Sequence, residues 1–254
     1  MTHSTLLSVD GLTVAYGGVT AVDAVTFAVP EAQVTGLIGP NGAGKTSLID
    51  ALTGYTRPAA GRVLLDGTDI TRRPAHWRAR QGLTRTFQSV ELFDDLTVRE
   101  NLLTARERTA AAALGSLTPR RAKASDHTSD VARALELTGL EAVADRYPAQ
   151  LTLGRRKLVG VARALASRPR LVLLDEPAAG LDSDESQEFG ARLRLLADDG
   201  VGVLLVDHDM GLVLSTCDQV MVLDFGRVIA SGPADEIRRD PVVISAYLGS
   251  EAAA

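Results

Sequence analysis

The chain of 254 residues lacks several features that mark other classes of protein. It has one cysteine, Cys217, so it cannot form an internal disulfide, and we expect a reducing compartment and a buried, inert thiol. No window holds the roughly 18 apolar residues that a membrane-spanning helix needs. The first residues contain no basic segment followed by an apolar run, so we expect no signal peptide. These features predict a soluble cytoplasmic protein that reaches a membrane only through a partner.

An excess of basic charge is also missing. The net charge is −5, which argues against a protein whose main task is to bind nucleic acid. We interpret the short basic clusters as solvated surface; they are Arg72-Arg73, Arg120-Arg121 and Arg155-Arg156-Lys157. A hydrophobic content of 45% is sufficient for a large core, and we find no internal repeat. We expect one domain over residues 1–249 and a short tail at 250–254.

Residues 39–46 fit the pattern G-x-x-x-x-G-K-[ST] of the loop that wraps nucleotide phosphates. An apolar segment at 34–38 predicts a buried strand before the loop, and 47–52 predicts a helix after it, whose N-terminus favours anions. Lys45 would contact the β- and γ-phosphates, and Thr46 would bind Mg²⁺. The loop predicts a nucleotide site made of Gly39, Pro40, Asn41, Gly42, Ala43, Gly44, Lys45, Thr46 and Ser47. A chance glycine-rich turn is the alternative, and the order of strand, loop and helix argues against it.

A pair of acidic residues follows a second apolar run. Residues 171–174 predict a buried strand, and Asp175 and Glu176 come at its carboxyl end, where ligands of open α/β sheets bind. Asp175 would hold Mg²⁺, partly through water. Glu176 would accept a proton from the water that attacks the γ-phosphate. The alternative is an acidic pair that caps the turn before Pro177, and the phosphate loop makes it the weaker interpretation.

The remaining pattern predicts an α/β fold. Residues 6–30 alternate apolar and polar side chains and predict antiparallel strands, with turns at 10–11 and 17–18. Further strands are predicted at 61–67, 80–88, 201–206, 220–223 and 227–230, and helices at 183–197 and 210–214. We expect a P-loop NTPase core with a mostly parallel sheet flanked by helices, an antiparallel β subdomain, and a helical subdomain at about 90–166. Within the helical subdomain, residues 110–129 predict either a mobile connection or a variable helical excursion.

With these motifs the chain resembles the ATP-binding cassette (ABC) ATPases over almost its entire length. The resemblance implies that Tyr16 stacks on adenine and that Gln88 meets Mg²⁺ and the attacking water. It also implies that Asp182, in the loop 179–182, reaches a second subunit and that His208 contacts the γ-phosphate. Each residue alone has a simpler interpretation. Tyr16 could be a half-buried strand-end aromatic, Gln88 an exposed polar residue, and His208 part of a helix-capping turn.

The family's Leu-Ser-Gly-Gly-Gln segment corresponds to residues 151–155, which we call the signature segment. Thr152 keeps a hydroxyl and Gly154 keeps a close backbone N–H for the γ-phosphate, whereas Leu153 and Arg155 depart from the family pattern. The resemblance implies two subunits paired head to tail, with each ATP between one phosphate loop and the partner's signature segment. We expect Leu153 to slow the partner's site, which favours a heterodimer over a homodimer.

Residues 36–46, 85–88, 207–210 and 246–249 resemble ATPase subunits of importers for branched-chain amino acids and related small polar solutes. This implies a Mg²⁺-dependent ATPase on the inner face of the cell membrane, with transmembrane permease subunits as partners and, indirectly, a solute-binding protein. Val90, Leu92 and Phe93 either contact the permease or anchor the helical subdomain. Three alternatives stay open: lipopolysaccharide or lipid export, a non-transport regulator, and a subunit that binds ATP without turnover.

Overall fold

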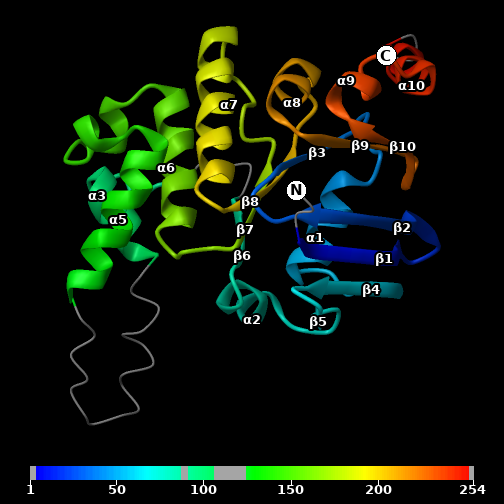
Figure 1. Ribbon diagram of the computed structural model, residues 1–254, viewed down its shortest axis with the longest axis horizontal. Helices are drawn as coiled ribbons and strands as arrows, with labels where there is room; N and C mark the ends of the chain where they lie inside the picture. Colours follow the sequence, from blue (N-terminus) through cyan, green and yellow to red (C-terminus); the bar gives the residue numbers. More distant parts are fainter. Residues whose placement is uncertain (1–3, 87–90, 106–123, 252–254) are drawn as a thin grey trace.

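The computed structural model describes residues 4–86, 91–105 and 124–251, which form two β-sheets with helices packed around them (Figure 1). Gln88, Val90 and most of the predicted connection at 110–129 lie outside the described residues. Among the helices that are described, none is long and apolar enough to cross a bilayer.

The smaller sheet is antiparallel and has the strand order β2-β1-β4-β5. Its strands are β1 (Thr5–Tyr16), β2 (Val19–Pro30), β4 (Ala60–Leu65) and β5 (Thr68–Asp69). The antiparallel strands predicted at 6–30 are therefore confirmed, but the turn predicted at 10–11 is wrong. Gly11 adopts a φ of 56° inside β1, where the pairing register shifts between Val9 and Leu12. Glycine accepts this left-handed conformation as a bulge, so the strand continues instead of reversing.

The larger sheet has the order β10-β9-β3-β8-β7-β6, and all its neighbouring strands are parallel except β10 and β9. Its strands are β3 (Val34–Ile38), β6 (Leu83–Thr86), β7 (Leu171–Asp175), β8 (Gly202–Val206), β9 (Gln219–Asp224) and β10 (Arg227–Pro233). Every residue of β3, β7 and β8 is buried, because continuous apolar strands bury both faces. The mostly parallel sheet is as predicted.

Helices cover both faces of this sheet. They are α1 (Lys45–Thr53), α2 (Ala75–Arg80), α3 (Val98–Thr104), α5 (Ala124–Thr138), α6 (Leu153–Leu165), α7 (Ser183–Asp198), α8 (Met210–Thr216), α9 (Ala234–Ile237) and α10 (Pro241–Glu251). Short 3₁₀ turns at Glu141–Val143 and Pro148–Gln150 lead into α6. The helices at 183–197 and 210–214 are thus confirmed, each with a slightly later end.

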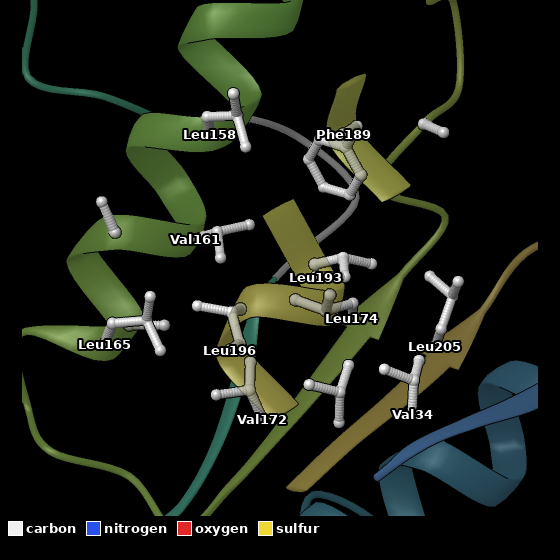
Figure 2. Packing of buried hydrophobic residues seen from close by; sticks show 14 of the residues in the cluster. Val34, Leu158, Val161, Leu165, Val172, Leu174, Phe189, Leu193, Leu196 and Leu205 are labelled. Carbon is white, nitrogen blue, oxygen red and sulfur yellow. The ribbon is translucent and has the colours of Figure 1, made fainter. Parts of the chain in front are cut away.

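Alternate residues of each strand enter different cores, as the strand period of two requires. Val172 and Leu174 of β7 pack with α6 and α7, whereas Leu171 and Leu173 pack with α1 and the antiparallel sheet. Figure 2 shows the first of these cores, where Leu158, Val161 and Leu165 of α6 face Phe189, Leu193 and Leu196 of α7 above the strands. The central sheet is therefore held rigidly from both sides, and its strand ends are fixed in place.

Two buried side chains, Cys217 and Arg78, lie next to the strand and the helix that flank the phosphate loop, β3 and α1. Cys217 is buried and its pKa is raised to about 12 by burial, so the predicted inert thiol is confirmed. The guanidinium of Arg78 is also fully buried and donates to the carbonyls of Ala51, Leu52, Thr71 and Arg73. Because the first two carbonyls belong to the last turn of α1, a cation at that position favours the helix dipole and fixes the helix.

Candidate functional site

The phosphate loop lies between β3 and α1 and is wedged against two neighbouring strands. A Cβ atom at Gly39 would lie 2.1 Å from the carbonyl oxygen of Leu223, and one at Gly44 would lie 2.3 Å from that of Ala21. Both glycines also have positive φ values, 157° and 102°. No other residue type fits these two positions without moving the backbone, so the glycines of the sequence pattern shape the loop here.

Lys45 lies inside this loop rather than in solvent. Its Nζ donates to the carbonyl oxygens of Gly39 at 2.7 Å and Pro40 at 3.0 Å. Burial lowers the pKa of Lys45, while Glu176, Asp175 and Asp207 favour its charged form. The loop thus encloses a positive charge that faces three carboxylates, while Thr46 next to it is exposed.

Asp175 and Glu176 leave the end of β7 in different directions. Asp175 is buried, and its Oδ2 accepts a hydrogen bond of 2.7 Å from Arg85. Glu176 adopts a φ of 45°, and its backbone N–H donates to Val206 at the end of β8. A non-glycine residue in the left-handed region is strained, and such strain is typical of functional sites.

The turn after β8 brings His208 towards Glu176. His208 Nδ1 lies 3.9 Å from Oε2 of Glu176 and 3.5 Å from Oδ1 of Asp207. Asp207 is fully buried and accepts backbone hydrogen bonds from Ala178, His208 and Asp209. Asp209 caps α8, as the simpler interpretation predicted, yet the imidazole still lies beside the carboxylate. The buried carboxylate of Asp207 therefore links the turn after β7 to the turn after β8 through hydrogen bonds.

The other predicted site residues lie in two further places. Tyr16 ends β1, where its side chain is exposed and its hydroxyl lies 3.3 Å from that of Thr56. Thr152 caps α6 and Asp182 caps α7, each accepting from backbone N–H groups of its own helix. Gly154 lies against Glu185, and Leu153 lies against Gly180. The signature segment and the loop 179–182 are thus neighbours. They precede α6 and α7, which pack on one face of the larger sheet, whereas α1 packs on the other (Figure 1).

A groove of about 540 Å³ separates the end of β6 from α6. Leu92, Phe93, Lys157 and Arg163 contribute to its wall, and the guanidinium of Arg163 lies over the ring of Phe93. The prediction that Lys157 belongs to a solvated cluster is wrong, since it is only 7% exposed. Burial lowers its pKa, while Asp207 and Glu176 favour its charged form. The helix turns this side chain inward, whereas Arg155 and Arg156 stay exposed.

Sequence reasoning did not assign a role to Arg85, Asp50 or Asp207, which join the site in the structure. Arg85 and Asp207 belong to segments that were singled out only for their resemblance to a family. Arg85 contacts Asp50 and Asp175, and Asp207 contacts Ala178, all far away along the chain, so no local pattern signals these contacts. Gln88, the remaining predicted site residue, lies outside the described residues.

Comparisons with known proteins agree with this geometry. The sequence pattern of the ABC transporter family matches residues 22–179, and that of the branched-chain amino acid ATP-binding cassette transporters matches residues 227–253. The chain is 41% identical to the high-affinity branched-chain amino acid transport ATP-binding protein BraF of Pseudomonas aeruginosa, over 96% of this chain and 98% of that protein.

Two further proteins, each an ATP-binding component of a transport system, are similar to this chain at lower sequence identity. The chain is 33% identical to the lipopolysaccharide export system ATP-binding protein LptB of Haemophilus influenzae, over 97% of this chain and 98% of that protein. Its fold is similar to the ADP conformation of MJ1267, an ATP-binding cassette of an ABC transporter, with a TM-score of 0.84 at 30% identity. That likeness covers 97% of this chain and 99% of the other. The chain therefore belongs to the ABC transporter family of ATP-binding cassettes.

Proposed function

We propose that this chain is the ATP-hydrolysing subunit of an importer for branched-chain amino acids or related small polar solutes. The observation that carries the proposal is the meeting of Lys45, Asp175, Glu176 and His208 at one edge of the sheet. The match of residues 227–253 and the similarity to BraF support this class of solute. Each part of the mechanism is supported by residues of this edge.

Binding of ATP uses the loop and its lysine. The backbone N–H groups of residues 41–47, at the loop and the N-terminus of α1, surround the phosphates. Lys45 exchanges its bonds to Gly39 and Pro40 for the β- and γ-phosphate oxygens, so the charge is already in place before the nucleotide arrives. Tyr16 is exposed at the end of β1 and stacks on adenine.

The donor set fits a magnesium ion that arrives with the nucleotide. Among the described residues no cluster of three or more His, Cys, Asp or Glu side chains could hold a metal unaided. Asp175 and the exposed hydroxyl of Thr46 supply oxygen ligands, which Mg²⁺ prefers, with Gln88 as the third expected contact. Held by these residues, Mg²⁺ would supply positive charge that offsets the negative charge developing on the phosphates during hydrolysis.

Hydrolysis is assigned to Glu176 and His208. The carboxylate of Glu176 accepts a proton from water while the water oxygen attacks the γ-phosphorus, and the bond to the bridging oxygen breaks to give ADP and phosphate. His208, 3.9 Å from Glu176, orients the carboxylate and the γ-phosphate. The strained backbone of Glu176 and its bond to β8 keep the base beside the loop.

A second cassette completes each site. Thr152 and Gly154 lie at the start of α6 and Asp182 at the start of α7, on the opposite face of the larger sheet from α1, which follows the phosphate loop. They therefore reach the γ-phosphate of a partner subunit in a head-to-tail pair, homodimeric or heterodimeric. The N-terminus of α6 presents backbone N–H groups to that phosphate.

Permease subunits provide the membrane attachment. The groove beside Phe93 has a volume of about 540 Å³, and the 50% exposed ring of Phe93 offers an apolar contact to a helix of a permease subunit. This contact would place the chain on the inner face of the cell membrane and transmit the opening and closing of the cassette pair. A solute-binding protein would act indirectly, on the other side of the permease.

The test is ATP hydrolysis by the purified chain and by Glu176→Gln, with and without Mg²⁺. General-base catalysis contributes about 10²–10⁴ in rate, so the variant should lose turnover by that factor while it still binds ATP. Glu188→Gln, at a glutamate exposed on α7, is the matched control and should keep the wild-type rate. Equal rates for wild type and Glu176→Gln would refute the assignment of the base.

Lipopolysaccharide export is the second candidate, supported by the similarity to LptB. The two functions differ in the permease that the cassette drives. Co-purification of the chain with its permease subunits, followed by leucine uptake into proteoliposomes, separates them. ATP-dependent uptake that is lost with Glu176→Gln supports the importer, and its absence in a complex that still hydrolyses ATP would contradict it.

A further inference from the structure

Arg85 occupies a position between the phosphate-loop helix and the end of β7 that the proposed mechanism does not use. Its side chain is 9% exposed. One terminal nitrogen donates to Asp50 Oδ1 at 2.5 Å and the other donates to Asp175 Oδ2 at 2.7 Å. A single guanidinium thus holds one carboxylate from α1 and another from β7.

The strand period explains why these groups meet. Leu83 of β6 faces the core that contains α1, so Arg85, two residues later, faces the same side. Leu171 and Leu173 of β7 face that core as well, and Asp175 continues their row. Because β6 and β7 are parallel neighbours, Arg85 and Asp175 lie side by side under Asp50 of α1.

The charges of this trio set what Asp175 can bind. Two carboxylates and one guanidinium sum to −1, whereas the two carboxylates alone sum to −2. A guanidinium is not deprotonated in proteins, so Arg85 keeps its positive charge, and it occupies Oδ2 of Asp175.

We infer that Arg85 is a positioning residue that makes divalent-cation binding at Asp175 depend on nucleotide phosphates. It holds Oδ2 and cancels one negative charge, which leaves Asp175 too weak a ligand to retain a cation without the phosphates. It also fixes the carboxylate so that the other oxygen is presented in one orientation. This inference rests on the proposed nucleotide site and adds a control over when the metal binds.

The test measures ATP affinity with a fluorescent ATP analogue, in excess Mg²⁺ and in EDTA, for wild type and Arg85→Gln. Coupling between two ligands typically changes affinity by about 5–150-fold. We expect the wild type to bind the ATP analogue more tightly in Mg²⁺ than in EDTA by a factor in this range, and we call this factor the gain. In Arg85→Gln the gain should fall below about twofold. A second measurement, thermal unfolding with Mg²⁺ alone, should show a rise in Tm for Arg85→Gln and none for the wild type, since a ligand that binds the folded state stabilises it.

Three further variants separate positioning from a structural role. Asp50→Asn leaves Arg85 on Asp175, so it should keep most of the Mg²⁺ gain. Arg85→Gln combined with Asp50→Asn restores the charge sum of −1, so it should lose the rise in Tm with Mg²⁺ alone and recover part of the gain, although Asp175 is no longer held in one orientation. Arg85→Lys keeps the charge without the two-pronged geometry and should recover the gain only in part. A purely structural role would lower Tm in all conditions and leave the ratio of the two affinities unchanged.

The outcomes are distinguishable. A wild-type protein whose ATP affinity is equal in Mg²⁺ and EDTA would refute the metal assignment of Asp175, and the inference with it. A wild-type gain that Arg85→Gln retains in full would overturn the inference alone. If Arg85→Gln does not fold, a full gain in Arg85→Lys would overturn it equally.

Discussion

The two parts of a nucleotide site that this one chain carries are built in opposite ways. At the phosphate-loop edge, Lys45, Asp175 and Asp207 are 7%, 8% and 0% exposed and contact residues from several strands and helices. At the signature segment, Thr152 only caps its own helix, and Leu153 is 38% exposed. The first part is complete within the fold, because buried charges need partners in the same chain. The second is an open surface, and in the proposed head-to-tail pair its partner is another subunit.

The largest expected effect comes from removing the charge at the enclosed part. Lys45→Met deletes the cation that faces the phosphates and should reduce ATP hydrolysis by about 10²–10³-fold, the usual loss for one stabilising donor. Phosphate release measures it. Arg156→Met, at an exposed cation of the signature helix, is the matched control and should change the rate little. Equal losses in the two variants would break the contrast between the two parts.

The second-largest expected effect is a loss of folding stability when the buried guanidinium beneath the phosphate-loop helix is removed. Arg78→Met leaves four backbone carbonyls without their shared donor, two of them in the last turn of α1. Hydrogen bonds to charged groups contribute about 1.5–3 kcal/mol each at most, so we expect a loss of about 3 kcal/mol in the free energy of unfolding. Denaturant unfolding measures this loss.

The control for that variant lies on the same helix. Arg80 is exposed on α2, so Arg80→Met should stay within about 0.5 kcal/mol of the wild type. A loss for Arg78→Met as small as that of its control would mean that the phosphate-loop helix does not depend on the buried guanidinium.

The smallest effect is expected at the open part. Leu153→Gly restores the family residue and should raise turnover severalfold, because a glycine lets the backbone N–H approach the phosphate of the partner's ATP. Steady-state hydrolysis at saturating ATP measures it. Leu153→Ala removes the side chain without the added backbone freedom and should give a smaller rise. An unchanged rate in Leu153→Gly would show that Leu153 does not slow the partner's site.

The sequence predicted the parts of the fold that local patterns encode. A few consecutive residues are enough to recognise each of these features: the phosphate loop, the buried strands of the larger sheet and the two acidic residues after β7. Arg85 was not predicted, because its partner Asp175 lies 90 positions away along the chain. The inward turn of Lys157 was missed for a similar reason, since a run of three basic residues does not reveal which one faces the core.

The positions of the site residues follow from the fold of this chain. The chemical roles of some of them depend on a second subunit in the proposed function. The end of β7 places Glu176 beside His208 as the order of the motifs implied, at 3.9 Å. The signature residues were placed by resemblance alone, and they lie at the start of α6, which packs on the opposite face of the larger sheet from α1. In the proposed head-to-tail pair their chemistry depends on a second molecule, which no pattern within this chain describes.

If two subunits share each nucleotide site, the oligomeric state of the hydrolysis-blocked protein should depend on the nucleotide that is bound. Light scattering would compare Glu176→Gln with the double variant that adds Gly154→Asp, each in Mg²⁺-ATP and in Mg²⁺-ADP. The account predicts a dimer for Glu176→Gln in ATP only, and a monomer for the double variant in both nucleotides, because an acidic side chain at position 154 repels the partner's γ-phosphate. A dimer that survives in the double variant, or one that forms equally in ADP, would contradict the account.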